Sequence, residues 1–348
     1  MPIELEELKL VLEELGDASD SLSYARLYAL SDLAGQNLAL FRTMWDAFPA
    51  SRRARLLQAL VELAETSFQV NFDAIFRHCL DDPYDEVRAA AIDGLWENEE
   101  VSLIGPLLTK LRTDPSVQVR TAAAAGLGRF VLAGELEQVE APVQSRITTE
   151  LLTSIYLAGE SVEVRRRAVE SVAYRCSPEV LEVIETAYYD EDEQMRISAI
   201  VGMGRSCDPR WKDIVLEELQ SSSAAMRYEA AVACGELMLH QAVPALGRLI
   251  DDPDQQVSDA SIWALGQIGG SAARQVLLRA YDDADDITRS AIEDALAEQA
   301  LLEGELDFTL YELDSSLEDD FDEEAYDGEL PYDWTDDDDD EDDFGLED

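Results

Sequence analysis

The stretch DEDEQMRISAIVGMG, from Asp190 to Gly204, decides the fold, because its pattern returns along the chain at a nearly constant interval. We take Met195 as the anchor position of the pattern. An Arg follows the anchor in five of seven copies, an Asp stands five residues before it in five copies, and a small residue stands four after it in every copy. The anchors are Val87, Val119, Val164, Met195, Met226, Val257 and Ile287, at steps of 32, 45, 31, 31, 31 and 30 residues.

Self-similarity at a period near 30 residues indicates a solenoid, in which each unit is too small to bury its own apolar face and stacks on its neighbours. The anchor and the residues four and eight positions after it fall on one face of a helix. The upstream Asp favours a turn and a helix cap. Glycine nine positions after the anchor predicts a bend or an end of the helix. These glycines are Gly128, Gly204, Gly235 and Gly266.

With its Asp-Pro, Val-Arg, Ala and Leu-Gly landmarks, the pattern resembles the short bacterial type of HEAT repeat, from about Arg52 to Glu303. The resemblance implies an all-α fold, a right-handed α-solenoid of about seven or eight antiparallel helix pairs. It also implies binding to other proteins, although relatives include bilin lyase subunits, deoxyhypusine hydroxylase and DNA glycosylases.

Three regions follow from this pattern. Residues 1–50 form two amphipathic helical stretches, one ended by Gly16 and one from about Ser23 to Phe48, and are predicted to be an N-terminal helical cap. Residues 51–303 form the repeat array, in which Ala54 is a candidate anchor for one more, degenerate copy. Residues 304–348 form an acidic segment. Within the array, the long step before Val164 is absorbed by residues 134–146, either as a neutral loop or helix extension or as a binding insertion.

The charge of the chain restricts its partners. The formal net charge is −50, with 23 acidic residues and no Lys, Arg or His between Glu305 and Asp348. This balance argues against direct binding to nucleic acid or to an anionic membrane. The N-terminus lacks the basic start of a secretory signal and no apolar run is long enough to span a bilayer, so we expect a cytoplasmic protein. The four cysteines show no paired spacing and are expected to be buried thiols.

The acidic segment is predicted to be disordered, because its charges repel one another and it has little apolar surface to bury. Aromatic residues spaced among the acids suit docking onto a basic protein surface. A solubilising role and a generally acidic proteome are the alternative explanations. The predicted docking motif consists of Tyr326, Tyr332, Trp334 and Phe344.

The arginines that follow the anchors have two interpretations. They either line a strip that binds anions or, as in HEAT-like arrays, bridge to an Asp of an adjacent unit, and we favour the second. A cluster on the Val164 helix exceeds this need and is the candidate partner-binding surface for acidic groups. Its residues are Arg165, Arg166, Arg167, Tyr174 and Arg175.

No catalytic, cofactor-binding or metal-binding residues are predicted. The hydroxylases in this group bind iron through repeated His-Glu pairs, whereas His78 and His240 are followed by Cys79 and Gln241. The phosphate-binding, serine-hydrolase and zinc-protease motifs are also missing from the sequence.

The sequence therefore predicts a non-enzymatic scaffold that binds a protein partner on the solenoid surface, with the acidic segment engaging basic surfaces or regulating the groove. The alternative is an accessory subunit of a protein-modifying or chromophore-attaching enzyme of the bilin lyase type.

Overall fold

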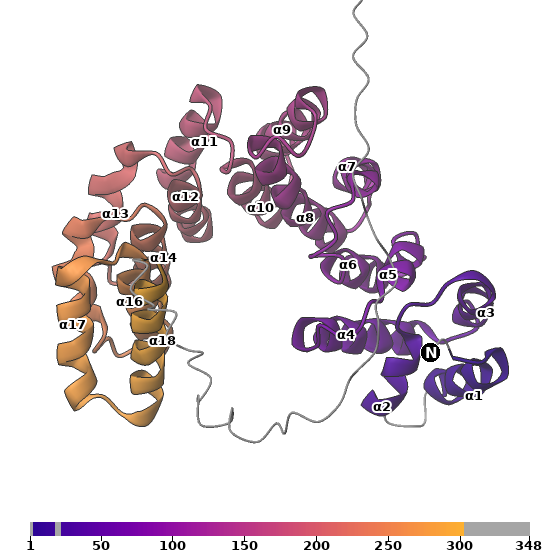
Figure 1. Cartoon of the computed structure of the whole chain (residues 1–348). Helices are drawn as coiled ribbons and strands as arrows, with labels where there is room; N and C mark the ends of the chain where they lie inside the picture. The colour runs from indigo at the N-terminus through magenta and orange to yellow at the C-terminus, as the bar shows by residue number, and fades with distance from the viewer. Residues whose placement is uncertain (1–2, 18–21, 303–348) are drawn as a thin grey trace, which may run out of the picture. The chain divides into compact units, whose positions relative to one another are not determined.

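The computed structural model describes residues 3–17 and 22–302, which form eighteen α-helices and four short 3-10 helices, with no strand in these ranges (Figure 1). By packing, the chain divides into Met1–Glu303 and Gly304–Asp348. The acidic segment, including Tyr326, Tyr332, Trp334 and Phe344, lies outside the described residues, so its predicted disorder and docking role stay predictions. The described part is an all-α solenoid, as the repeat pattern predicts.

The helices from α4 onward pack in two rows. In the first row each helix contacts the next first-row helix along the chain, and the second-row helices pack against it (Figure 1). The first row consists of α4 (Ala50–Thr66), α6 (Asp85–Asp93), α8 (Val117–Glu135), α10 (Val162–Val172), α12 (Glu193–Arg205), α14 (Ala224–Glu236), α16 (Gln255–Ile268) and α18 (Asp286–Leu302). The second row consists of α5 (Asp73–Cys79), α7 (Ile104–Thr113), α9 (Ala141–Tyr156), α11 (Pro178–Tyr188), α13 (Lys212–Glu218), α15 (Val243–Leu249) and α17 (Gly270–Asp283).

The 3-10 helices lie at the starts of helices or in the N-terminal region. Three of them precede second-row helices: η2 (Val101–Leu103), η3 (Pro209–Trp211) and η4 (His240–Ala242). The N-terminal region contains α1 (Leu5–Gly16), α2 (Tyr24–Leu27), η1 (Tyr28–Leu30) and α3 (Gly35–Trp45). The first predicted helix is confirmed and ends at Gly16. The second predicted stretch is interrupted between η1 and α3, where Asp32 and Gly35 adopt positive φ angles of 56° and 54°.

The anchor positions form the core between the rows. Val87, Val119, Val164 and Val257 are fully buried, and Met195 is 1 % exposed. Because each anchor is covered by its own unit and by the neighbouring helices, no unit completes its core alone.

The structure changes the register of the last unit. Ile287, the anchor expected there, is 74 % exposed, whereas Ile292 is fully buried. Ala295 stands opposite Gly266, as Ala264 stands opposite Gly235 one unit earlier. The anchor is therefore Thr288, one residue later than expected, and the Arg position is filled by Arg289.

The register of the first copy also differs from the prediction. Arg53 forms an ion pair of 2.9 Å with Asp82, as Arg88 does with Asp114 one unit later. The anchor is therefore Arg52, which is 2 % exposed, and not Ala54. The guanidinium of Arg52 donates to the carbonyl of Leu15, so this charged anchor joins the array to α1.

Glycine nine positions after the anchor has a role in addition to the predicted one. Gly204 and Gly235 are the residues before the last of α12 and α14, and Gly266 lies two residues before the end of α16, as predicted, whereas Gly128 lies well inside α8. A Cβ at Gly204 would lie 3.0 Å from the Cα of Ala233 on the next first-row helix. The absence of a side chain therefore permits close contact between neighbouring helices.

Two of the four cysteines differ from the prediction. Cys79 and Cys234 are buried as expected, whereas Cys176 and Cys207 are exposed, and all four are free thiols. The exposed pair lies in the turns that follow α10 and α12, where the chain leaves the first row.

Residues 134–146 extend two helices. They contribute the end of α8, which has 19 residues, and the start of α9, which has 16, with only a short turn between them. Neither α8 nor any other described helix is both long and apolar enough to cross a membrane.

Candidate partner-binding surface

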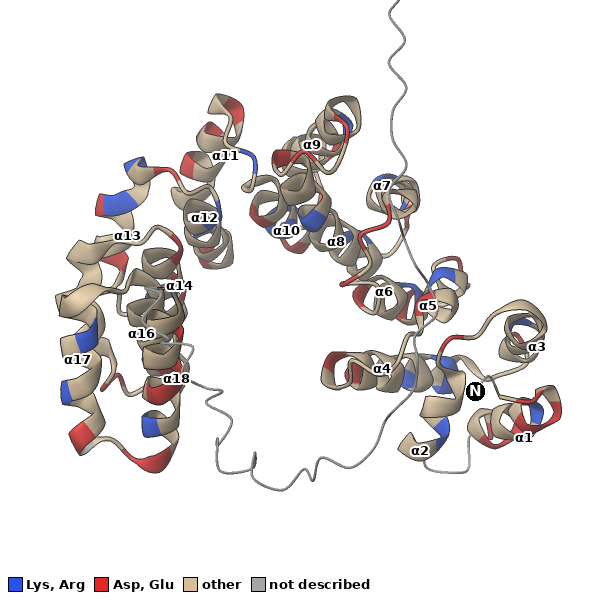
Figure 2. Cartoon of the chain, viewed as in Figure 1, with Lys and Arg blue, Asp and Glu red and all other residues tan. Residues whose placement is uncertain are grey.

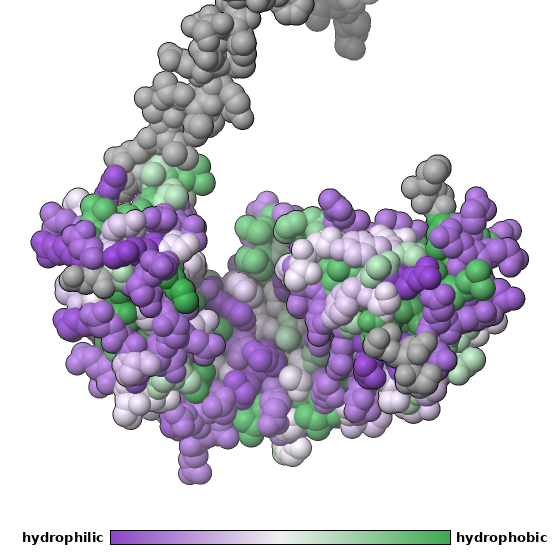
Figure 3. Space-filling model, turned by 90° about the horizontal axis from the view of Figure 1, so that it is seen from below, coloured by the Kyte–Doolittle hydropathy of each residue, from purple (hydrophilic) through white to green (hydrophobic). Residues whose placement is uncertain are grey.

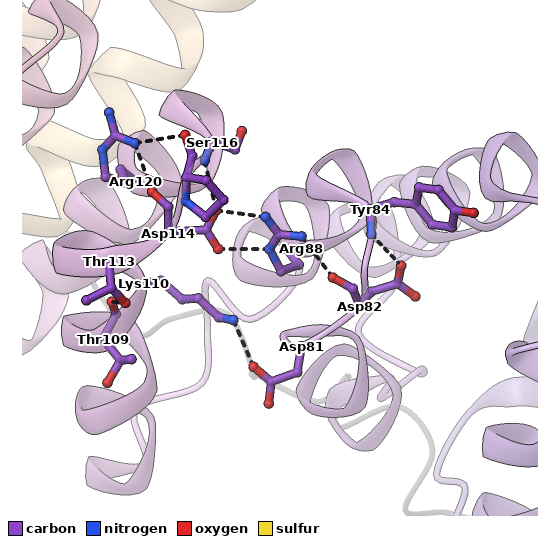
Figure 4. Close-up of polar contacts among 11 residues, drawn as sticks. Asp81, Asp82, Tyr84, Arg88, Thr109, Lys110, Thr113, Asp114, Ser116 and Arg120 are labelled. Atoms are coloured by element: carbon purple, nitrogen blue, oxygen red, sulfur yellow. Dashed lines mark hydrogen bonds and ion pairs between the residues drawn. The ribbon is translucent and has the colours of Figure 1, made fainter.

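The five arginines that directly follow an anchor, together with Arg53 and Arg289, form what we call the arginine ladder. In its best-formed contact, Arg88 on α6 donates two hydrogen bonds to the carboxylate of Asp114, of 2.8 and 2.7 Å (Figure 4). A third, of 2.9 Å, goes to the carbonyl of Asp82. Asp114 lies in the turn before α8, so each such pair joins a first-row helix to the turn that starts the next one.

The carboxylate of the pair is held from both sides. Asp114 also accepts a hydrogen bond of 3.0 Å from the backbone N–H of Ser116, which closes the turn before α8. Burial opposes the charged form, but the hydrogen bonds from Arg88 and Ser116 outweigh it and lower the pKa of Asp114. The predicted turn chemistry of the upstream Asp is confirmed.

The ladder is uneven along the array. Arg227 repeats the two-hydrogen-bond geometry with Asp252, and Arg120 pairs with Glu160 at 2.8 Å. Arg165 lies 3.8 Å from Asp190. Arg196 reaches the carbonyls of Asp190 and Glu191, as the other ladder arginines reach the turn before their own helix. It forms no ion pair among the described residues, and the next unit has Ser221 at the position of Asp114 and Asp252.

These contacts confirm the structural interpretation of the ladder. Its guanidinium groups are directed at carboxylates and carbonyls of the array itself, which fixes the stacking of adjacent units. The candidate binding surface is therefore the part of the first row outside the ladder.

The five residues predicted to bind acidic groups lie at and just beyond α10, and each has a partner within the array. Arg165 donates to the carbonyl of Ile155 at 3.0 Å, Arg166 to Ser198 at 3.0 Å, and Arg167 to Glu170 at 2.6 Å. The Tyr174 ring lies 5.0 Å below the guanidinium of Arg205, and Arg175 lies 3.9 Å from Glu135. Their role in binding a partner stays a prediction.

Arg166, Arg167 and Tyr174 belong to a polar cluster at α10 and α12. Two carboxylates of α14, Glu229 and Glu236, lie beside it. Glu170 accepts hydrogen bonds of 2.6 Å from Arg167 and from Ser198, and its side chain is buried. Arg205 on α12 donates to the Glu170 carbonyl at 2.9 Å. These polar contacts link α10 to α12.

Carboxylates outnumber cations at the α14 side of this cluster. Burial, together with the Glu170 and Glu236 carboxylates, raises the pKa of Glu229 to about 7 against the opposing charges of Arg205 and Arg167. Burial also raises the pKa of Glu236, and the positive charge of Arg205 opposes this shift. This end of the face is short of positive charge.

Two of the hollows on the array lie beside the 134–146 insertion and between α14 and α16, and neither was predicted. One, of about 880 Å³, lies between α9 and α11 and is lined by Leu152, Tyr156 and Arg175 among others, so the 134–146 insertion contributes a wall through Ser145. The other, of about 490 Å³, lies between α14 and α16. A signal for the second was present in the sequence, since Tyr228 and Trp263 occupy positions two and six after their anchors, outside the core positions.

The two histidines lie in different units of the array, one in α5 and one in η4. His78 is half-buried on α5, where burial lowers its pKa, and His240 is exposed with its ring 3.1 Å from the Met238 carbonyl. No group of three or more His, Cys, Asp or Glu in the described part of the chain is placed to hold a metal ion.

Comparison with sequence families agrees with the stacked geometry. Residues 212–297 match the family described as HEAT repeats, and residues 103–133 match the family described as HEAT repeat. These two segments carry HEAT repeats. The first matched segment spans α13 to α18, and the second spans α7 and most of α8, so the matches fall on units that have both rows.

Several solved structures are similar to the chain at low identity. YibA of E. coli is 18 % identical, over 72 % of this chain and 97 % of its own, with a TM-score of 0.40. Human deoxyhypusine hydroxylase is 17 % identical over 85 % of this chain and 96 % of its own, with a TM-score of 0.33. Yeast importin-beta is 13 % identical over 84 % of this chain and 46 % of its own, with a TM-score of 0.47. No curated protein matches the chain.

Proposed function

We propose that this HEAT-repeat chain is a non-enzymatic scaffold that holds a protein partner on the face of its first row directed away from the second row. The acidic segment 304–348 engages basic surfaces or regulates access to that face. The observation that carries the proposal is the first row itself. Its eight helices are every second helix from α4 to α18, each contacts the next, and together they leave one face outside the core.

Exposed hydrophobic side chains on the array support binding to a protein. Figure 3 shows such side chains interspersed among hydrophilic ones on the surface seen from below. Trp96 is 50 % exposed and Trp263 is 38 % exposed, and both line hollows between first-row helices. Partly exposed aromatic side chains next to polar groups are typical of protein interfaces.

Site-specific crosslinking tests where the partner binds. A photoreactive residue at Ser290, exposed on α18, is compared with one at Leu278, exposed on α17 of the second row. We expect the partner to crosslink at position 290 and not at position 278. Equal crosslinking at both positions, or crosslinking at 278 alone, would contradict the proposed face.

Deletion of residues 305–348 tests the acidic segment. Partner binding is measured for the full chain and for the deletion variant at low and at high salt. Contacts made by the segment's charges should weaken as the Debye length falls from about 10 Å to about 3 Å between 0.1 and 1 M salt. The same affinity and salt dependence for both chains would remove the segment from the mechanism.

A further inference from the structure

The hollow between α14 and α16 combines two kinds of group in one place. Tyr228 and Trp263 supply aromatic surface and are 37 % and 38 % exposed. Asp259 supplies a carboxylate, and Val232 and Ala260 form the rest of the apolar lining with Gln256 at the edge. An aromatic wall beside a carboxylate is the combination that binds an organic cation.

The Asp259 carboxylate has no cation of its own in the described part of the chain. One of its oxygens accepts a hydrogen bond of 2.9 Å from the Gln255 amide on the same helix. No Lys or Arg within residues 3–17 and 22–302 forms an ion pair with it. The carboxylate is therefore available to a charge supplied from outside.

The helices around the hollow carry more acidic than basic residues. Between Lys212 and Leu302 there are sixteen Asp and Glu against six Lys and Arg. Within α14, α16 and α18 the basic residues are Arg227 and Arg289, which both belong to the ladder and bond to groups of the array. Figure 2 shows these three helices with more red than blue. The first row around the hollow thus favours a positively charged ligand.

We propose that this hollow binds an arginine side chain presented by the partner protein, with the guanidinium stacked on the Trp263 indole and hydrogen-bonded to Asp259. The inference rests on the proposed function and specifies the chemistry of the partner at one point of the face. Arginine suits the site better than lysine because its planar group stacks on an aromatic ring and still donates in-plane hydrogen bonds. The chain's own acidic segment is excluded as the ligand, since it has no Lys, Arg or His.

A second hollow on the same row provides the control. It lies between α4, α6 and α8 and is lined by Trp96, Glu65 and Asp93, but also by Arg129. Arg129 donates to the Asn98 carbonyl at 3.0 Å and places a positive charge in the hollow. An arginine ligand is disfavoured there by repulsion, although the tryptophan and the carboxylates are present.

The test uses the full chain and a fluorescent peptide, acetyl-Gly-Gly-Arg-Gly-Gly-amide, with matched peptides that carry lysine or citrulline. We expect the arginine peptide to bind about fivefold more tightly than the lysine peptide, and the neutral citrulline peptide to bind too weakly to measure. Trp263→Ala and Asp259→Asn should each weaken the arginine peptide about tenfold, whereas Trp96→Ala should leave its affinity unchanged. Far-ultraviolet circular dichroism checks that each variant is folded.

Equal binding of the arginine and citrulline peptides, or unchanged affinity in Trp263→Ala and Asp259→Asn, would overturn the proposal, because the peptide would then be held by the general negative charge of the chain. The result is independent of the crosslinking experiment. Peptide binding at the hollow without a crosslinked partner contradicts the scaffold function alone, and a crosslinked partner without peptide binding contradicts the arginine site alone.

Discussion

Arg227 on α14 and Asp252 in the turn before α16 are joined by two hydrogen bonds of 2.8 Å each, across 25 residues of sequence. The same arginine donates to the carbonyl of Ser221 in the turn before its own helix, at 2.9 Å. One side chain therefore spans the starts of two successive first-row helices. Because the geometry recurs at Arg88, with Asp82 and Asp114, it sets the spacing of the units from within.

Removal of a buried ladder arginine should destabilise the array strongly. Arg88→Ala leaves the buried Asp114 carboxylate without its cation, so we expect the free energy of unfolding to fall by about 3 kcal/mol. Arg77→Ala is the control, because its partner Glu100 is exposed and the loss should be below about 1 kcal/mol. Urea denaturation followed by circular dichroism measures both. Similar losses in the two variants would show that burial of the pair is unimportant.

A carboxylate partner added for Arg196 should stabilise the array. Ser221→Asp places a carboxylate before α14 where Asp252 and Asp114 stand before α16 and α8, within reach of Arg196 by the repeat geometry. We expect a gain of about 0.5–1 kcal/mol in the free energy of unfolding. Ser222→Asp adds the same charge at the exposed neighbouring position and should give no gain. If both variants gain equally, the effect is one of charge at the helix start and not of pairing with Arg196.

The crossing glycines should not tolerate a methyl group. A Cβ at Gly266 would lie 3.3 Å from the Cα of Ala295 on α18, so Gly266→Ala requires neighbouring backbones to separate. We expect a loss of about 1–3 kcal/mol. In contrast, Gly105 in α7 has nothing within 4 Å of its Cβ position, and Gly105→Ala should stabilise the protein by about 0.5–1 kcal/mol. Thermal unfolding of both variants decides whether the glycines serve contact or helix termination.

Glu229 should make stability depend on pH near neutrality. Its folded pKa of about 7 lies above the ordinary value of 4.5, so the folded protein holds a proton that the unfolded chain has released between these pH values. Stability is therefore lost as pH rises from about 4.5 to about 7. The groups around Glu229 are Glu170 and Arg167 on α10, Arg205 on α12 and Glu236 on α14.

Glu229→Gln removes this dependence. We expect the variant to be more stable than the parent at pH 8, by on the order of 2 kcal/mol, and to match it near pH 4.5. Denaturation at both pH values measures the difference. Glu163→Gln, at an exposed position on α10, is the control and should show the same difference from the parent at both pH values. A pH-independent gain in Glu229→Gln would contradict a raised carboxyl pKa.

The core positions and the turns could be predicted from the sequence because they depend on contacts that recur in every unit. The period placed Val87, Val119, Val164 and Met195 in the core, and the Asp before each first-row helix in its turn. The Arg and Asp positions also predicted the ladder contact from Arg88 to Asp114. In all these cases the same residue types meet at the same spacing, so one unit predicts the next.

What the sequence left open depends on how neighbouring units meet. The anchors at Arg52 and Thr288 are polar, so only the burial of Leu56 and Ile292 around them reveals the register at each end of the array. The close contact at the glycines was not predicted, because it is made with the following unit and not with their own helix. The exposure of Cys176 and Cys207 likewise depends on the turns that follow α10 and α12.

The sequence by itself determined that this protein is a stack of similar helix pairs, because burial in such a stack imposes a period on the chain. The tertiary structure alone decided which side chains face outward together. Tyr228 and Asp259 are 31 residues apart, and their common hollow exists because α14 and α16 pack side by side. Periodicity records what each unit buries, whereas a binding surface is made of residues that the core does not constrain.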